Sequence, residues 1–368
     1  MQKFVTLIFA ILACSALGIT VWVSWEGESF YQEAANRFQS ETGIEVNLVY
    51  FPKIEDKLNI ALKTGDLPDL ALIKDTYTGN IGASRRAVRI DPSDLSGFED
   101  KYLQAYSWNG NAFGMPYYAD LQVAFLNRRV FAAAGVEVPK SLDFEDLPNI
   151  YSELKRVVDY PIAFDFTSPY MMFPYISIDS QPIDTNGRPL VFSMETVMAV
   201  SKVKSYFDSG VISRLERGAL NGLFRDGKIG IMLQGSYLAP RFRSAGLDFE
   251  MLSLPDLEGA VVSGVIDSKG FVFFNEKTYS GSVRFARYLI ENSESFYEEF
   301  AKYPLLSKLE GAAEIDKIID KGQFIPNHPG YQTILFESFE KALQMIFSGR
   351  MSIEDSLIGA QGYIDSMW

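Results

Sequence analysis

Three short apolar stretches near the start of the chain are each followed by side chains that could bind a polyhydroxylated ligand. The stretches are residues 20–23, 44–50 and 70–73, and the side chains after them are Ser24, Trp25 and Glu26, then Lys53, then Asp75 and Tyr77. Carboxylates accept hydrogen bonds from hydroxyl groups, and aromatic faces pack against the C–H side of a sugar ring. These residue types therefore point to a sugar-like ligand.

The segments between the stretches have helical patterns, at residues 29–42 and 54–62. Strands that alternate with helices in this way predict a right-handed βαβαβ unit with a parallel sheet. Ligands of such sheets bind beyond the carboxyl ends of the strands, where the loops diverge. The candidate residues above all lie at those ends, so we expect them to line one crevice.

Two more candidates follow strands further along the chain: Tyr170 and Tyr237. Tyr170 follows a predicted strand at 162–166, and Tyr237 ends the strand that comes after the Gly227 turn. A long extended run at residues 113–127 is predicted to cross from a first lobe to a second. For Asp75 and the two tyrosines a structural role, in a turn or in the core, is the competing interpretation.

The length of 368 residues predicts two lobes rather than one core. An apolar run at 264–274 is the expected return crossing, and a third crossing is expected at 311–320. Helical stretches at 332–347 and 352–366 should pack on the second lobe. The fold class is therefore α/β.

Composition excludes several functions. The 34 basic and 47 acidic residues give a net charge of −13, which disfavours nucleic acid and anionic membrane surfaces as partners. His328 is the single histidine and Cys14 the single cysteine, which disfavours zinc sites and Cys–His nucleophiles. No dinucleotide or Walker loop follows the first strand. We expect no metal and no cofactor.

Residues 1–18 have the pattern of a secretory signal peptide: Lys3, an apolar stretch at 4–12, and Ala16 and Gly18 as small residues before a cleavage site. We expect export to the periplasm or another extracytoplasmic location, with a lipid anchor at Cys14 as the less favoured alternative.

The chain from residue 19 onward resembles family 1 extracellular solute-binding proteins of ABC importers, the group that includes maltose-binding protein. The similar stretches occur in the family's order, at residues 41–46, 64–69, 115–127, 169–170, 224–232 and 326–329. The resemblance implies the two-lobed periplasmic binding protein fold of type II, with three hinge crossings and a ligand cleft between lobes. It implies a sugar ligand, such as a malto-oligosaccharide, and delivery to a membrane permease by a non-enzymatic protein, which we expect to be monomeric.

The expected domains are 1–18 as signal peptide, 19–118 with 268–312 as lobe 1, and 119–267 with 313–368 as lobe 2. The family's sugar-contacting positions fall on the candidates above, on Asp120 within the extended run, and on Phe336, for which packing in the core is the favoured interpretation. The family's stacking tryptophans are replaced here by Ile73, Tyr237 and Leu335, so the resemblance does not specify the sugar.

Two alternatives remain open. A secreted glycosidase needs two carboxylates, which Glu26, Asp75 and Asp120 could supply. The same scaffold could instead bind a sugar phosphate, a polyamine or another small polar solute. An anionic ligand would require cations such as Lys53, Lys74 and Arg241 to converge.

Overall fold

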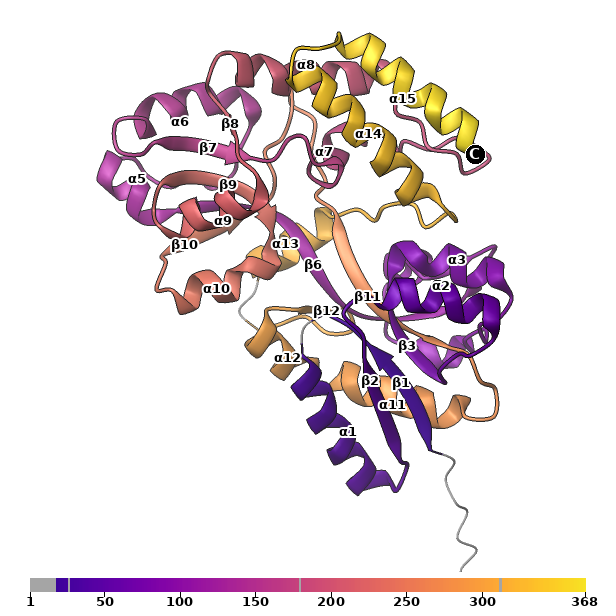
Figure 1. Cartoon of the computed structure of the whole chain (residues 1–368). Coiled ribbons are helices and arrows are strands. Elements are labelled where there is room, and N and C mark those ends of the chain that lie inside the picture. Colours follow the sequence, from indigo (N-terminus) through magenta and orange to yellow (C-terminus); the bar gives the residue numbers. More distant parts are fainter. Residues whose placement is uncertain (1–17, 26, 179, 311–312) are drawn as a thin grey trace, which may run out of the picture.

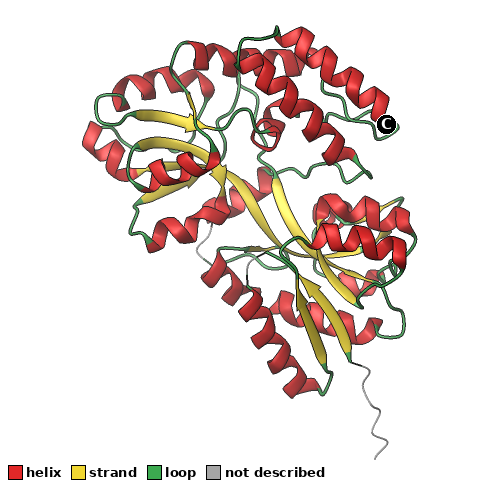
Figure 2. Cartoon of the chain, in the orientation of Figure 1, coloured by secondary structure: helices red, strands yellow, loops and turns green. Residues whose placement is uncertain are grey.

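The computed structural model describes residues 18–25, 27–178, 180–310 and 313–368. Glu26 and residues 1–17 of the predicted signal peptide, which include Cys14, lie outside the described residues. Within the described part, no helix is both long enough and apolar enough to cross a membrane. Figure 2 shows an α/β architecture in which helices surround one extended mixed sheet.

The first lobe begins with the predicted βαβαβ unit. Its elements are β1 (Ile19–Val23), α1 (Glu28–Thr42), β2 (Val46–Tyr50), α2 (Ile54–Thr64) and β3 (Leu70–Lys74). β1 pairs in parallel with both β2 and β3, so the strand order is β2–β1–β3. The parallel sheet predicted from the alternating pattern is confirmed.

Apolar side chains on both faces of this sheet explain why helices cover it on both sides. Val21 and Leu72 are fully buried in a cluster with Phe38 of α1. On the opposite face Trp22 and Ile73 lie in a cluster with residues of α2. The remaining elements of this lobe are η1 (Asp75–Tyr77), α3 (Thr78–Ser84), η2 (Pro92–Leu95), α4 (Asp100–Ala105), β4 (Ser107–Trp108), β5 (Asn111–Ala112), α11 (Tyr279–Glu291), α12 (Ser293–Phe300) and β12 (Tyr303–Pro304).

Two long strands pass between the lobes (Figure 1), as predicted from the apolar runs. β6 (Gly114–Asn127) is buried along its whole length; its first half pairs with β11 (Ile266–Phe273), and its second half pairs with β9 (Ile229–Gly235). β11 also pairs with β3 of the first lobe. A single sheet therefore runs through both lobes, and its central strands form the hinge.

The second lobe is built around β9, which pairs in parallel with β7 (Tyr160–Phe164). Its other elements are α5 (Arg128–Ala134), η3 (Phe144–Asp146), α6 (Leu147–Leu154), α7 (Pro169–Ile176), α8 (Met194–Asp208), β8 (Ser213–Arg214), α9 (Arg217–Arg225), η4 (Ser236–Leu238), α10 (Ala239–Ser244), β10 (Phe249–Leu252), α14 (Tyr331–Phe347) and α15 (Ile353–Met367). The C-terminal helices α14 and α15 pack with α7 and α8 around one apolar cluster, as predicted.

The chain returns to the second lobe through α13 (Ala313–Lys321) and the segment 322–330. Residues of α13 lie in an apolar cluster with Tyr102 of α4 and Ile266 of β11. The Asn327 side chain then donates hydrogen bonds to the Ala105 and Ser107 carbonyl oxygens, at 2.8 and 3.0 Å. The exact lobe boundaries, and the place of the third crossing, remain proposals.

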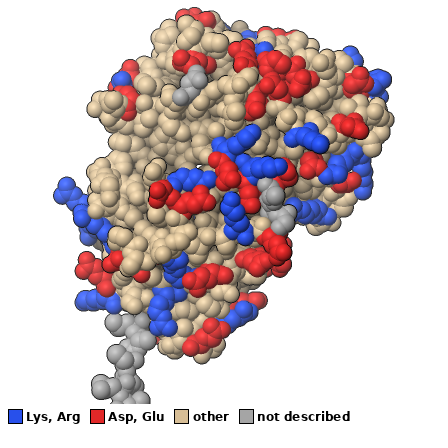
Figure 3. Space-filling view, turned by 180° about the vertical axis from the view of Figure 1, so that it is seen from behind, with Lys and Arg blue, Asp and Glu red and all other residues tan. Residues whose placement is uncertain are grey.

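The described surface carries charges of both signs. On the face seen in Figure 3, acidic and basic side chains are intermixed rather than gathered into one basic area. Several of them form exposed ion pairs, such as Arg128 with Asp248 at 3.7 Å.

Candidate functional site

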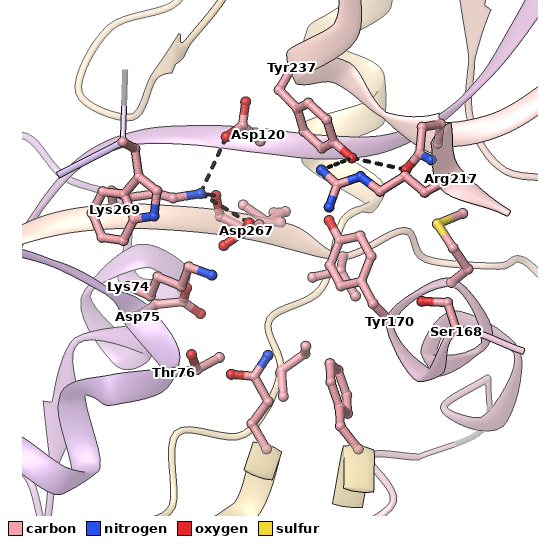
Figure 4. Close-up of a pocket in the computed structure, with 18 of the residues that line it drawn as sticks. Lys74, Asp75, Thr76, Asp120, Ser168, Tyr170, Arg217, Tyr237, Asp267 and Lys269 are labelled. Atoms are coloured by element: carbon pink, nitrogen blue, oxygen red, sulfur yellow. Dashed lines mark hydrogen bonds and ion pairs between the residues drawn. The ribbon is translucent and has the colours of Figure 1, made fainter. Parts of the chain in front are cut away.

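A cavity of about 570 Å³ lies between the two lobes, bordered by the hinge strands. This volume is within the range of roughly 300–1,000 Å³ that is common for small-molecule sites. Its lining is Trp25, Lys74, Asp75, Thr76, Asp120, Asp165, Ser168, Tyr170, Met171, Arg217, Gln234, Tyr237, Val265, Ile266, Asp267, Lys269, Ile325, Gln332 and Phe336. Figure 4 shows most of these side chains arranged around the open space.

The first-lobe wall comes from the carboxyl ends of β1 and β3. Trp25 follows β1 with a left-handed backbone (φ +66°), and its carbonyl oxygen accepts a hydrogen bond from the Tyr50 hydroxyl at the end of β2. The Trp25 ring lies 5.7 Å from the Lys269 ammonium, in cation–π range. Lys74 and Asp75 follow from the end of β3. Strand ends of one parallel sheet thus bring these side chains to one wall.

Asp75 is the most unusual titratable group of the site. Only 1% of the residue is exposed, and its Oδ1 atom has no hydrogen-bond partner among the described residues. Burial and the negative charge of Asp267 raise the pKa of Asp75 to about 8, against the opposing charge of Lys269. At neutral pH Asp75 is therefore mostly a neutral carboxylic acid, able both to donate and to accept a hydrogen bond.

The hinge wall is a network of buried charges on the crossing strands. Asp120 of β6 accepts hydrogen bonds from Lys302, at 2.9 and 3.0 Å, and from Lys269 of β11, at 3.3 Å. Lys269 also pairs with Asp267 at 3.0 Å. Burial opposes ionisation of Asp267, but the charges of Lys269 and Lys74 outweigh it and hold the pKa of Asp267 below its ordinary value. Burial also opposes ionisation of Lys269, but the negative charges of Asp267 and Asp120 outweigh it and raise the pKa of Lys269.

The second-lobe wall combines aromatic rings with a hydrogen-bonded polar chain. Arg217, at the start of α9, donates to the Tyr237 hydroxyl at 2.9 Å, and that hydroxyl donates to Gln234 at 3.1 Å. Burial raises the pKa of Tyr237, against the opposing charge of Arg217, so the hydroxyl stays protonated. Tyr170 from α7 and Phe336 from α14 complete this wall.

Six of the ten predicted ligand-binding residues line the cavity: Trp25, Asp75, Asp120, Tyr170, Tyr237 and Phe336. Their contact with a ligand remains a prediction. Glu26 lies outside the described residues.

The other three predicted residues do not line the cavity. Ser24 is fully buried and donates to the Phe51 carbonyl oxygen at 2.6 Å, so its hydroxyl serves the sheet edge. Lys53 is exposed just before α2. The Tyr77 hydroxyl bonds to Asn59 of α2. Successive residues at a strand end point in different directions, so a position at a strand end does not by itself place a side chain in the cavity.

Several lining residues were missed, above all Asp267, Lys269 and Arg217. A sequence signal existed for the first two, because an Asp-x-Lys pair interrupts the apolar run 264–274 with a spacing of two that puts both on one strand face. Arg217 had no such signal, since it reaches Tyr237 only through the packing of α9. Within the described part, no cluster of His, Cys, Asp or Glu has a metal-binding arrangement.

Residues 33–326 match the family model described as bacterial extracellular solute-binding protein. The chain belongs to this family. The two-lobed fold and the resemblance seen in the sequence are thereby confirmed.

Curated relatives of this solute-binding protein include two from Bacillus subtilis (strain 168). The maltodextrin-binding protein MdxE is 22% identical over 78% of this chain and 72% of its own length. The galactooligosaccharide-binding protein is 22% identical over 92% of this chain and 86% of its own length. A maltooligosaccharide ABC transporter solute-binding lipoprotein of Streptococcus pneumoniae is 21% identical, with 80% and 74% covered.

Proposed function

We propose that this solute-binding protein binds a sugar or oligosaccharide in the interlobe cavity, outside the cytoplasm, and delivers it to the permease of an ABC importer. The observation that carries the proposal is the composition of the cavity walls. Aromatic rings from both lobes face the same space as carboxyl, amide and hydroxyl groups. Sugars present apolar C–H faces and hydroxyl edges, which match these two kinds of group. The relatives are named for maltodextrin, galactooligosaccharide and maltooligosaccharide, which supports the same class of ligand.

Calorimetric titration of the mature protein tests the proposal. The panel contains malto-oligosaccharides, galacto-oligosaccharides and their monosaccharides, and we expect one saccharide to bind one to one. A micromolar Kd corresponds to about 8 kcal/mol. Absence of binding to this panel, extended to acidic saccharides, would refute the sugar proposal without affecting the family.

Trp25 and Tyr237 supply a sharper test, because the proposal makes them ring-packing groups on opposite walls. We expect Trp25→Ala and Tyr237→Ala each to weaken binding by about tenfold, since an aromatic contact contributes about 0.5–1.5 kcal/mol beyond its buried area. Met194→Ala, at an exposed position on α8, is the control and should leave affinity unchanged. Unchanged affinity in both aromatic variants would contradict the assignment of the walls.

A glycosidase is the second candidate, because the raised pKa of Asp75 is a property of a general acid. The other carboxylates of the hinge argue against it: Asp120 and Asp267 are held by Lys269 and Lys302 rather than free to attack a sugar. Incubation with oligosaccharides and analysis of chain lengths separates the two functions. Shortened chains that disappear in Asp75→Asn would establish the enzyme.

A further inference from the structure

The acids on the hinge wall of the cavity are paired with two lysines, Lys269 of the same wall and Lys302, which does not line the cavity. Asp120 contacts Lys302 at 2.9 Å and Lys269 at 3.3 Å, and Asp267 contacts Lys269 at 3.0 Å. Two carboxylates and two ammonium groups thus form one compact network. The formal charges of these four described residues cancel.

The two remaining lining acids also supply no unbalanced negative charge. Asp165 pairs with Arg214 at 3.4 Å and accepts further hydrogen bonds from Thr167. Asp75 forms no ion pair within 4 Å with a described residue, and its burial and the charge of Asp267 favour its uncharged form against the charges of Lys269 and Lys74.

Two cations of the lining, Lys74 and Arg217, form no ion pair within 4 Å among the described residues, although the charge of Lys74 also acts on Asp267 at longer range. Lys74 lies directly opposite Lys269 in the antiparallel pair of β3 and β11, so its nearest strand neighbour is another cation. Arg217 uses one N–H group on the Tyr237 hydroxyl at 2.9 Å. A guanidinium has five N–H donors, so others are left for a ligand. Figure 4 shows the Lys74 and Arg217 head groups pointing into the cavity from different walls.

An excess of positive charge in a partly enclosed cavity favours a ligand with negative charge. Low dielectric walls strengthen the attraction, whereas the overall charge of the protein is screened within about 8 Å at physiological salt. Arginine in particular binds carboxylate and phosphate oxygens through paired N–H groups.

We propose that the saccharide bound in this cavity carries an acidic group, which Arg217 and Lys74 bind from the two lobes as they close. This inference rests on the proposed sugar-binding function and narrows its substrate class. The shared chemistry is an anionic saccharide, and its acidic group could be a uronate carboxylate or a sugar phosphate. The orphaned Asp75 carboxylic acid adds a donor for an anionic oxygen on the first-lobe wall.

The test compares matched acidic and neutral sugars by calorimetry in 20 mM and 200 mM KCl. The pairs are a galacturonic acid trisaccharide with the galactose trisaccharide of the same linkage, and glucose 6-phosphate with glucose. We expect one acidic sugar to bind about tenfold or more tightly than its neutral partner, and the preference to shrink at the higher salt concentration. The pair that shows the preference identifies the uronate or the phosphate.

Variants assign the preference to the two cations. Arg217→Gln and Lys74→Gln should each reduce affinity for the acidic sugar by about tenfold and affinity for the neutral sugar by less than twofold. Arg225→Gln is the matched control, since Arg225 lies on the same helix, α9, but pairs with Asp226 at 2.9 Å on the surface. It should change neither affinity.

Three results would overturn the inference. Neutral sugars that bind as well as or better than acidic ones would refute it and leave sugar binding intact. Equal losses for both kinds of sugar in Arg217→Gln would show that the residue merely holds Tyr237. Absence of binding to all four ligands and to the wider saccharide panel would refute the proposed function itself.

Discussion

Replacement of Asp75 by asparagine should stabilise the protein increasingly as the pH rises. The folded state holds this carboxyl in its protonated form, with a pKa of about 8, whereas in the unfolded chain the value is the ordinary 3.8. Between these two values the unfolded state binds fewer protons than the folded state, so the free energy of unfolding of the wild type falls with pH. Asparagine has a similar shape and no proton to lose, so the variant escapes this loss.

The expected magnitude follows from the width of that pH window. Each unit of pH inside it changes the free energy of unfolding by about 1.4 kcal/mol, so from pH 5.5 to 7.5 the variant should gain about 2.5 kcal/mol on the wild type. For a mature chain of about 350 residues, with an unfolding entropy of about 2.1 cal/mol/K per residue, this corresponds to a Tm difference of about 3–4 °C. Above pH 8.5 the difference should level off.

Urea unfolding at pH 5.5, 6.5, 7.5 and 8.5 measures this dependence for Asp75→Asn, the wild type and a control. The control is Asp184→Asn, because hydrogen bonds from the Arg188 and Asn186 backbone N–H groups and from the Arg188 guanidinium lower the pKa of Asp184. Its stabilising contribution is present throughout this range and is lost only when the pH falls below the ordinary value of 3.8. Asp184→Asn should therefore be less stable than the wild type by a constant amount. A constant offset for Asp75→Asn as well would show that Asp75 is ionised at neutral pH and refute the reasoning.

Two further substitutions test the packing of the hinge. Lys302→Met should lower the free energy of unfolding, measured in urea, by about 3 kcal/mol. This is at the lower end for a broken buried ion pair, because Lys269 still contacts Asp120. Adding Asp120→Asn should restore part of the loss, and purely additive effects in the double variant would contradict the pairing. Gly79→Ala should cost about 1–3 kcal/mol, because its Cβ would collide with the Asn327 carbonyl oxygen. Gly222→Ala on α9, where no atom lies within 4 Å of a new Cβ, should instead be neutral or stabilising.

Much of the fold could be predicted because the sequence patterns that specify its strands and helices are local. Alternating apolar strands and helices fix the parallel βαβ order, and the two crossing strands are apolar runs too long for an ordinary sheet edge. Strand ends then bring Trp25 and Asp75 together without any knowledge of tertiary contacts. The same reasoning predicted Ser24 and Tyr77 in the cavity. In the structure the backbone direction turns their hydroxyl groups toward Phe51 and Asn59 instead.

The charges of the site were beyond local reasoning because they depend on pairing across the sheet. Asp120 looked like a free carboxylate for a sugar hydroxyl, yet Lys302, which directly precedes β12 and lies 182 residues later in the chain, donates a hydrogen bond to it. Lys74 was recognised as a possible cation, but its expected companions Lys53 and Arg241 do not line the cavity, and Arg217 does. An isolated sequence position gives no sign of whether its charge is already compensated.

The buried network belongs both to the cavity wall and to the strands that connect the lobes. Asp120 and Lys269 line the cavity, yet they belong to β6 and β11, the strands that connect the lobes. The register between these strands shifts at Lys269 and Gly270, next to the ion pairs. Under the proposed function, a ligand that contacts either residue would act directly on the strands that join the two lobes. No separate chain of residues is needed to carry the effect from the cavity to the hinge, since the cavity wall and the hinge are one structure.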